Sequence, residues 1–224
     1  FEPGKFAQAQ KVEEGTTNLC PYPTDFSQSA WATSNVTKQP NSGIAPDGST
    51  TMCKIIETTA NAVHEIRTPS MTTTSGTCYT FSVIAKAGER RHIRVGLTGA
   101  QFGTSRYIVV DLSNGSVVNI VGSPYAYGVR SLGNGFYFIY ITHQASASAS
   151  GTQYIGLQPD ATTTTYVGNK GSGLYIWHPQ VEAKPYATSF IDGTRSPESL
   201  TIPTAGVLNP QEGTVECWVY LCGD

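Results

Sequence analysis

The chain has 224 residues, of which 13% are charged and 10% are aromatic, and its formal net charge is −2. A low charged fraction together with abundant Gly, Thr, Ser and Tyr is typical of a turn-rich all-β protein and argues strongly against a helical bundle. The sequence contains no Lys/Arg run. Because affinity for phosphate backbones comes largely from clustered cations, we expect no nucleic-acid partner.

The first stretch, residues 1–17, predicts a flanking strand in "GKFAQAQKVEEG". Its beginning, "FEPGKFAQAQ", lacks the basic-then-apolar pattern of a secretory signal. No apolar run in the chain approaches the length that a membrane-spanning helix needs. We therefore expect neither a targeting segment nor insertion into a membrane.

The five cysteines are Cys20, Cys53, Cys78, Cys217 and Cys222. They form no C-x-x-C pair and have no histidine at zinc spacing. Free cysteines usually behave as small buried apolar residues. We expect free thiols and synthesis in a reducing cytoplasm, with a Cys53–Cys78 disulfide as the alternative.

Strand patterns recur from residue 18 onward, between turn signals and with almost no helical periodicity. In "TCYTFSVIAKAG" the apolar side chains Tyr79, Phe81, Val83 and Ala85 alternate with largely polar ones. "RHIRVGLTG" continues this alternation after "AGER", which we interpret as a hairpin turn.

The next strands follow two Asn-Gly dipeptides. Asn114-Gly115 predicts a two-residue hairpin, because both turn positions tolerate positive φ. Asn134-Gly135 precedes another aromatic strand, and "GTQYIGLQPD" and "SGLYIWHPQVEA" supply the last two. The low-complexity stretches 145–151 and 160–166 are predicted to be mobile surface loops.

These strands predict an all-β fold. Roughly ten antiparallel strands need a second sheet to cover the first, which gives a sandwich or jelly roll. We expect one antiparallel β-sandwich domain over residues 18–195. After it, residues 196–224 begin a second β unit that is cut short, and its strand Thr214–Leu221 is expected to pair with the opening stretch and bring the termini together.

Several motifs in order suggest a family. "NLCPYPTDFSQSAWATSNVT", "SGTCYTFSVIAKAG", "NGFYFIYIT" and "GLYIWHPQVEAKPYATSFI" resemble jelly-roll carbohydrate-binding modules of phage-tail and prophage proteins. The end, "ESLTIPTAGVLNPQEGTVECWVYL", resembles the start of a laminin-G or concanavalin-like sandwich. The resemblance implies a non-catalytic module in a virion or extracellular fibre, with polysaccharide as its partner and possible self-association within the fibre.

The same resemblance implies a structural calcium ion, with Asp25 as its best surviving ligand. Trp177 and His178 stand where the family has an acidic pair. Calcium takes six to eight oxygen ligands, and a tryptophan supplies none. A calcium ion is therefore the less favoured alternative, and no other cofactor is expected.

Sugar binding requires flat aromatic rings for the apolar faces of the sugar and planar polar groups for its hydroxyls. "SPYAYGVR" can present Tyr125, Tyr127 and Arg130 on one face if no bulge intervenes, and "FGTSRY" adds two residues beside a turn. The candidate ligand-binding residues are His92, Arg94, Arg106, Tyr107, Tyr125, Tyr127, Arg130, Trp177 and Gln180. The alternatives are a place in the core for any single tyrosine and a solvated strand face for Arg94.

The last strand is predicted to bulge at Trp177-His178, because Pro179 withholds an amide donor. Ile176 and Val181 then face inward, and Trp177 and Gln180 face outward. An outward tryptophan is either covered by a loop or used for binding, and the sequence leaves both open. Trp31 is expected to pack in the core near Phe26.

Catalysis is not expected. The chain has no G-x-S-x-G, H-E-x-x-H or Gly-rich phosphate loop. Glycoside hydrolysis needs two paired carboxylates, and the candidates Glu57, Glu65, Glu89 and Asp111 are scattered, although Glu57 and Glu65 could face each other across a hairpin. The alternatives to a glycan-binding module are a structural or assembly module and an accessory domain of a glycan-degrading enzyme.

Overall fold

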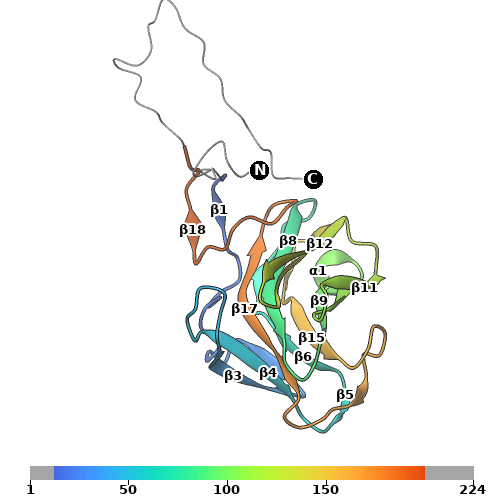
Figure 1. Ribbon diagram of the computed structural model, residues 1–224. Coiled ribbons are helices and arrows are strands. Elements are labelled where there is room, and N and C mark those ends of the chain that lie inside the picture. The colour runs from blue at the N-terminus through green and yellow to red at the C-terminus, as the bar shows by residue number, and fades with distance from the viewer. Residues whose placement is uncertain (1–12, 200–224) are drawn as a thin grey trace, which may run out of the picture.

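Two six-stranded antiparallel sheets lie face to face in the computed structural model, which describes residues 13–199 (Figure 1). The first sheet has the order β11 (Ser116–Val121), β10 (Arg106–Asp111), β9 (His92–Leu97), β15 (Tyr154–Gln158), β6 (His64–Arg67) and β2 (Ala32–Ser34). The second has the order β12 (Ala126–Gly133), β13 (Phe136–Gln144), β8 (Cys78–Ala87), β17 (Gly173–Glu182), β4 (Met52–Glu57) and β3 (Val36–Gly43). The predicted all-β antiparallel sandwich is confirmed.

Short elements complete the described part of the chain. The pairs are β1 (Thr16–Thr17) with β18 (Thr194–Arg195), β7 (Met71–Thr72) with β14 (Ser150–Gly151), and β5 (Asn61–Ala62) with β16 (Tyr166–Val167). The one helix among residues 13–199 is α1 (Gly99–Phe102). No helix in this part of the chain is long and apolar enough to cross a membrane.

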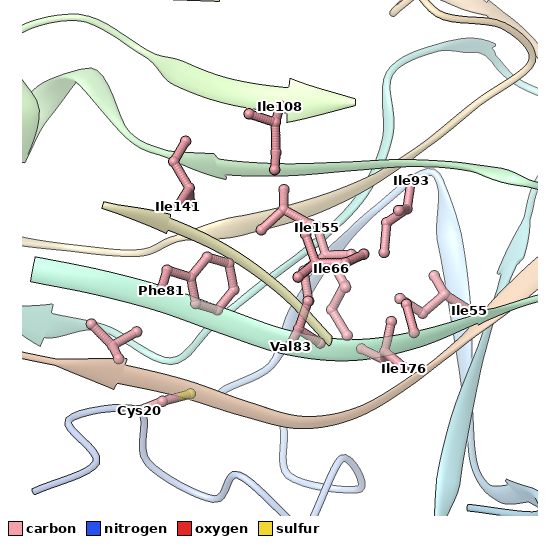
Figure 2. Close-up of a cluster of buried hydrophobic side chains, with 14 of the residues drawn as sticks. Cys20, Ile55, Ile66, Phe81, Val83, Ile93, Ile108, Ile141, Ile155 and Ile176 are labelled. Atoms are coloured by element: carbon pink, nitrogen blue, oxygen red, sulfur yellow. The ribbon is translucent and has the colours of Figure 1, made fainter. Parts of the chain in front are cut away.

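The core lies between the two sheets. Figure 2 shows its centre, where Phe81 and Val83 of β8 meet Ile93, Ile108 and Ile155 of the first sheet. The predicted alternation on β8 is confirmed, since Tyr79, Phe81, Val83 and Ala85 all join this core. Burial of this apolar surface is the main force that holds the sheets together.

The opposite face of β8 is also covered. Thr80, Ser82 and Ile84 are buried there: Ile84 packs against Trp177 in a second apolar cluster, and the Thr80 hydroxyl donates to the carbonyl of Lys184. Phe26 and Trp31 also belong to the main core, with ring centroids 4.9 Å apart, as the sequence predicts.

One turn prediction is wrong and another is confirmed in part, since β10 and β11 form the predicted hairpin but through a longer connection. The "AGER" connection does not close a hairpin: β8 lies in the second sheet and β9 in the first, so the chain crosses the sandwich there. Residues 112–115 form a four-residue turn, in which Gly115 has φ +78° and donates its N–H to the carbonyl of Asp111. The two-residue hairpin with positive φ at both positions occurs instead at Asn134-Gly135.

The two low-complexity stretches are fixed to the sandwich. Ser146 N–H donates to the carbonyl of Gln101, and β14 pairs with β7. In the second stretch Asp160 accepts hydrogen bonds from the N–H groups of Thr162 and Thr163, and β16 pairs with β5. Both stretches therefore have backbone partners in neighbouring segments, and their mobility stays a prediction.

The described ends of the chain meet at one end of the sandwich, where β1 and β18 pair (Figure 1). Thr16 lies opposite Arg195, whose Nη1 donates to Glu13 Oε2 at 2.8 Å. The predicted strand Thr214–Leu221 and its proposed partner in the opening stretch lie outside the described residues.

The cysteines within residues 13–199 are free thiols. Cys20 and Cys53 are buried, and desolvation raises the pKa of Cys53 to about 12. These two therefore act as small apolar core residues, and the alternative Cys53–Cys78 disulfide is absent.

Candidate binding groove

An open groove of about 380 Å³ lies on the outer face of the first sheet. Side chains alternate across a strand, so the residues next to core residues Ile66, Ile93, Ile108 and Ile155 point outward. The residues lining this cavity, which we call the Arg94 groove, are Ser34, Asn35, Val63, Glu65, Arg67, Arg94, Ser105, Tyr107 and Tyr154.

A carboxylate between two guanidinium groups lies at the centre of the groove. Glu65 Oε2 accepts from Arg94 Nη2 at 2.8 Å, and Glu65 Oε1 accepts from Arg67 Nε at 2.9 Å and Nη2 at 2.6 Å. The side chains of Glu65 and Arg94 are only 7% and 8% exposed, whereas that of Arg67 is 40% exposed. Arg67 is thus the charged group that solvent, or a ligand, can reach most easily.

Two tyrosine rings flank this charged centre. The guanidinium carbon of Arg94 lies 5.4 Å from the ring centroid of Tyr107 and 5.1 Å from that of Tyr154. The rings are 6.5 Å apart and inclined at 63°. Both contacts fall within the range of cation–π attraction. Burial raises the pKa of Tyr154, so its phenol stays neutral and can donate a hydrogen bond.

Two glycines make room for these side chains. A Cβ on Gly96 would stand 2.2 Å from Cζ of Tyr154, and a Cβ on Gly156 would stand 2.9 Å from Nε of Arg94. Real Cβ atoms do not approach other atoms so closely. The ring and the guanidinium can lie low against the sheet only because these positions carry no side chain.

Polar groups in the groove have unused hydrogen-bonding capacity. Nε of Arg94 is buried and has no hydrogen-bond partner in the structure. Within residues 13–199, no group forms a hydrogen bond with the hydroxyl of Tyr107 or Tyr154. Buried polar groups normally have partners, so a site with several unmatched donors is suited to a polar ligand.

Two of the predicted binding residues, Arg94 and Tyr107, lie in this groove. His92 is on the same outer face, but it does not line the cavity. It is buried beside Asp111, with 3.7 Å between His92 Nε2 and Asp111 Oδ2.

Arg106 lies elsewhere, because it is adjacent to Tyr107 and points to the opposite side of β10. Its Nη1 donates to the carbonyl of Ser123 at 3.4 Å. Nearby, the ring of Tyr125 stands edge-on to His143 at 4.1 Å and is 63% exposed. Desolvation and the charge of Arg106 lower the pKa of His143. The structure therefore brings Arg106 and Tyr125 together, but outside the Arg94 groove.

Tyr127 and Arg130 lie on opposite faces of edge strand β12. Tyr127 is opposite Ile141, a core residue, whereas Arg130 is opposite Phe138 and lies 5.4 Å from the centroid of its ring. The ladder runs without a register shift between residues 126 and 131. The expectation of one shared face is wrong. The two positions differ by three, an odd number, and side chains that far apart on a strand point to opposite faces.

Trp177 lies at the predicted bulge, since the ladder with β8 shifts register between Trp177 and Gln180. Its ring faces away from the main core and packs with Met52, Ile84 and Phe136. Nε1 donates to Oγ1 of Thr51 at 3.0 Å, and the residue is 8% exposed. Of the two alternatives left open by the sequence, the structure shows the covered ring, so Trp177 offers no exposed platform.

His178 completes a stack of three rings. Its ring centroid lies 3.3 Å from that of Trp177 and 3.6 Å from that of Phe190. Its backbone has φ +49°, which is uncommon outside glycine and marks the bulge. Burial lowers the pKa of His178 to about 4.

Gln180 faces away from the main core as the sequence predicts, opposite Ser82 of β8, but it is buried beneath the segment that follows β17. Its Oε1 accepts from the N–H of Ile191 at 2.8 Å, and its Nε2 donates to the carbonyl of Ser189 at 3.4 Å. Both contacts come from backbone that returns over the bulge. Gln180 therefore fixes this segment.

Asp25, the predicted calcium ligand, stabilises a local turn. Its Oδ1 accepts from the N–H and the hydroxyl of Ser27, and its Oδ2 accepts from Nε2 of Gln28. These hydrogen bonds lower the pKa of Asp25. Within residues 13–199, no group of three His, Cys, Asp or Glu side chains is arranged to hold a metal ion.

Sequence reasoning missed Glu65, Arg67 and Tyr154 as members of the groove, and missed Gly96 and Gly156 as its floor. Glu65 and Arg67 alternate with Ile66, and Tyr154 precedes Ile155, so their outward orientation can be read from the sequence. Their proximity to Arg94 cannot, because it depends on β15 pairing with both β6 and β9.

Comparisons with known proteins identify no family. No family model matches the chain, and no curated protein matches it. Among solved structures, the chain is similar to the enzymatically active domain of tailspike protein 4 of Bacteriophage CBA120, with 15% sequence identity and a TM-score of 0.40. The match covers 74% of this chain and 21% of that one, so the chain spans about a fifth of its length.

Proposed function

We propose that this chain is a non-catalytic glycan-binding module and that its ligand occupies the Arg94 groove. The observation that carries the proposal is the placement of the Arg94 guanidinium against the rings of Tyr107 and Tyr154, over a floor of glycines. Aromatic faces suit the C–H surface of a pyranose, and planar charged groups suit its hydroxyls. An open groove buries little of a ligand, so single-site affinity should be weak and avidity should come from repetition.

The groove has a single lining carboxylate, which supports a role in binding rather than in catalysis. Glu65 is the only acidic residue among those lining the groove, and both of its oxygens are engaged by arginines. Glycosidases need a second carboxyl group about 5 to 10 Å away. Glu57 does not supply it, because it lies on β4 in the other sheet, where Arg90 binds it bidentately.

The biological setting follows from the sequence motifs. Their resemblance to phage-tail and prophage modules supports a tail or fibre protein of a virion that recognises a polysaccharide on a host surface. Such a module works without a cofactor, and the proposal assigns none.

The test is a glycan array probed with the wild-type protein, a Tyr107→Ala variant and a Tyr127→Ala control. Tyr107 lines the groove and is partly exposed, whereas Tyr127 is an exposed ring on the other sheet. We expect Tyr107→Ala to reduce binding about fivefold or more, since the stacking of a nucleic-acid base on an aromatic side chain is worth about 1–3 kcal/mol and a sugar face stacks in a similar way. The control should bind as the wild type does. Equal binding by Tyr107→Ala, or no binding by the wild type, contradicts the proposal.

A second candidate function is an assembly module, favoured by one observation. Along the edge formed by β11 and β12, the apolar side chains Val118, Ile120, Tyr125, Tyr127 and Leu132 are exposed. Unpaired edges and apolar patches commonly mark contacts between chains. Concentration-dependent association in sedimentation velocity, abolished by Ile120→Glu and combined with a blank array, would favour this function over glycan binding.

A further inference from the structure

We propose that the Arg94 groove selects glycans whose sugar units carry a carboxylate. This inference rests on the proposed function and narrows it from glycans in general to acidic ones. It is argued from the charge and the hydrogen-bond donors that the groove presents.

The lining residues of the groove carry a net positive charge. Arg67 and Arg94 are its cations and Glu65 is its only anion, while its other lining residues are neutral. One positive charge therefore remains when the three groups are ionised. The buried Tyr154 does not offset it, because its raised pKa keeps the phenol protonated.

The hydrogen-bond donors of the groove also outnumber the protein acceptors that they bind. Arg94 donates to Glu65 only through Nη2, and Arg67 only through Nε and Nη2. A guanidinium has five N–H donors and no acceptor. Most of these donors thus have no protein acceptor within residues 13–199, and the tyrosine hydroxyls add two more groups without a partner.

The one charged acceptor among the lining residues is already occupied. Glu65 receives three guanidinium hydrogen bonds and is almost fully buried. A neutral sugar whose hydroxyls donate as well as accept therefore finds only neutral oxygens to donate to, such as the hydroxyls of Ser34 and Ser105. A carboxylate accepts only, and its two oxygens match the fork of a guanidinium.

Arg67 is the group that meets this carboxylate. Its side chain is 40% exposed, whereas that of Arg94 is 8% exposed and lies against two rings. Arg94 shapes the groove, and Arg67 can turn one edge toward a ligand. Arg67 should therefore determine selectivity without being essential for folding.

The experiment is affinity electrophoresis of the full chain in gels containing polygalacturonate, alginate, hyaluronate or polysialate. Each polymer is paired with its carboxyl-reduced counterpart, which keeps the backbone and replaces the carboxylate by a primary alcohol. We expect retardation by at least one native polymer to be about tenfold stronger than by its reduced form, and to weaken as salt rises from 0.05 to 0.5 M.

Variants separate recognition from general electrostatic attraction. Arg67→Gln should remove most of the preference for the native polymer while changing affinity for the reduced form less than twofold. Arg67→Lys should restore it only in part, because an ammonium lacks the planar fork. The matched control Arg130→Gln removes one exposed cation from the other sheet and should leave the preference intact.

The outcomes are distinguishable. Equal binding of native and reduced polymers, or binding confined to neutral glycans, overturns the acidic selectivity and leaves the proposed function standing. An equal loss in Arg130→Gln and Arg67→Gln also overturns it, since the attraction is then non-specific. Only the absence of binding to every polymer in the gels and to every glycan on the array contradicts both proposals.

Discussion

Two glycines determine the shape of the groove at the scale of single residues. Gly96 lies under the ring of Tyr154, and Gly156 lies under the guanidinium of Arg94. A glycine within a strand normally weakens it, because backbone entropy is lost without a side chain to pack. The close approach of a ring and a cation to the backbone offsets this loss, so these glycines belong to the binding surface.

We predict that Gly96→Ala destabilises the fold by about 1–3 kcal/mol and impairs glycan binding, because its Cβ would overlap the Tyr154 ring. Gly156→Ala is the matched comparison. Its Cβ would meet a flexible arginine that can move aside, so stability should fall by less than about 1 kcal/mol while binding still weakens. Urea unfolding and affinity electrophoresis measure the two effects. Unchanged stability in Gly96→Ala would show that the ring does not lie where the structure places it.

A second residue, His178, should make stability depend on pH. Burial lowers its pKa from the ordinary 6.5 to about 4, although Asp47 and Asp192 act in the opposite direction. Between these values the unfolded chain binds a proton that the folded chain does not. The stability that His178 contributes is therefore complete above pH 6.5 and is lost as pH falls toward 4.

We predict that His178→Phe, which keeps an aromatic ring, flattens the fall in unfolding free energy between pH 7 and pH 5. The contribution removed is at most about 1.4 kcal/mol per pH unit, the value for one proton. His178→Asn suits the positive φ and also cannot titrate there, so it should flatten the curve equally while differing in absolute stability. The measurement is denaturant unfolding at several pH values. A slope like that of the wild type in both variants rules out His178 as the titrating group.

At the scale of elements, the bulge of β17 depends on a residue far away in the sequence. Asn18 Oδ1 accepts from the N–H groups of Cys20 and Val181, and its Nδ2 donates to the carbonyls of Pro179 and Ile191. One side chain thus satisfies four backbone groups, and two of them, the Val181 N–H and the Pro179 carbonyl, belong to the irregular strand. Asn18 connects the start of the sandwich to its last long strand.

We predict that Asn18→Ala costs about 2–4 kcal/mol of stability, because it leaves several buried polar groups without partners. Thr17→Ala is the control: Thr17 is its exposed neighbour, and the change should stay within about 0.5 kcal/mol. The midpoint of urea unfolding measures both. A loss below 1 kcal/mol in Asn18→Ala would mean that water replaces these contacts.

The strands themselves could be predicted from the sequence, but their assignment to sheets could not. Alternation along β8 identified its core face correctly, because its apolar side chains recur at every second position. The connection to β9 resembled a hairpin because it is short. Whether such a connection forms a hairpin or crosses to the other sheet depends on the strands with which each partner pairs. Here β8 pairs with β13 and β17, whereas β9 pairs with β10 and β15.

The candidate site was predictable to the same extent. Arg94 was identified from the polar face of its strand and Tyr107 from its place beside a turn, and the pairing of β9 with β10 brings them together. Glu65 and Tyr154 reach Arg94 through ladders between distant segments, which a single sequence does not reveal. The prediction that the Trp177 ring faces away from the core was correct. The residues that cover this ring, Thr51 and Met52, lie more than a hundred residues earlier in the sequence.

At the scale of the whole molecule, the two candidate surfaces lie on different parts of the sandwich. The outer face of the first sheet carries the Arg94 groove, and the edge at β11 and β12 carries exposed apolar side chains. The described ends meet at β1 and β18. A ligand in the groove thus leaves the apolar edge and the paired ends free, which suits a module repeated within a larger assembly.

The most direct measurement is a titration of the isotopically labelled chain with a bound oligosaccharide, followed by amide chemical shifts. We predict that the largest changes fall on Gly96, Gly156 and Tyr107 and on the strands that carry Glu65 and Arg67. Amides of the β11–β12 edge should barely move. Changes centred on that edge, or at the stack of Trp177 and His178, would contradict the assignment of the Arg94 groove as the glycan site.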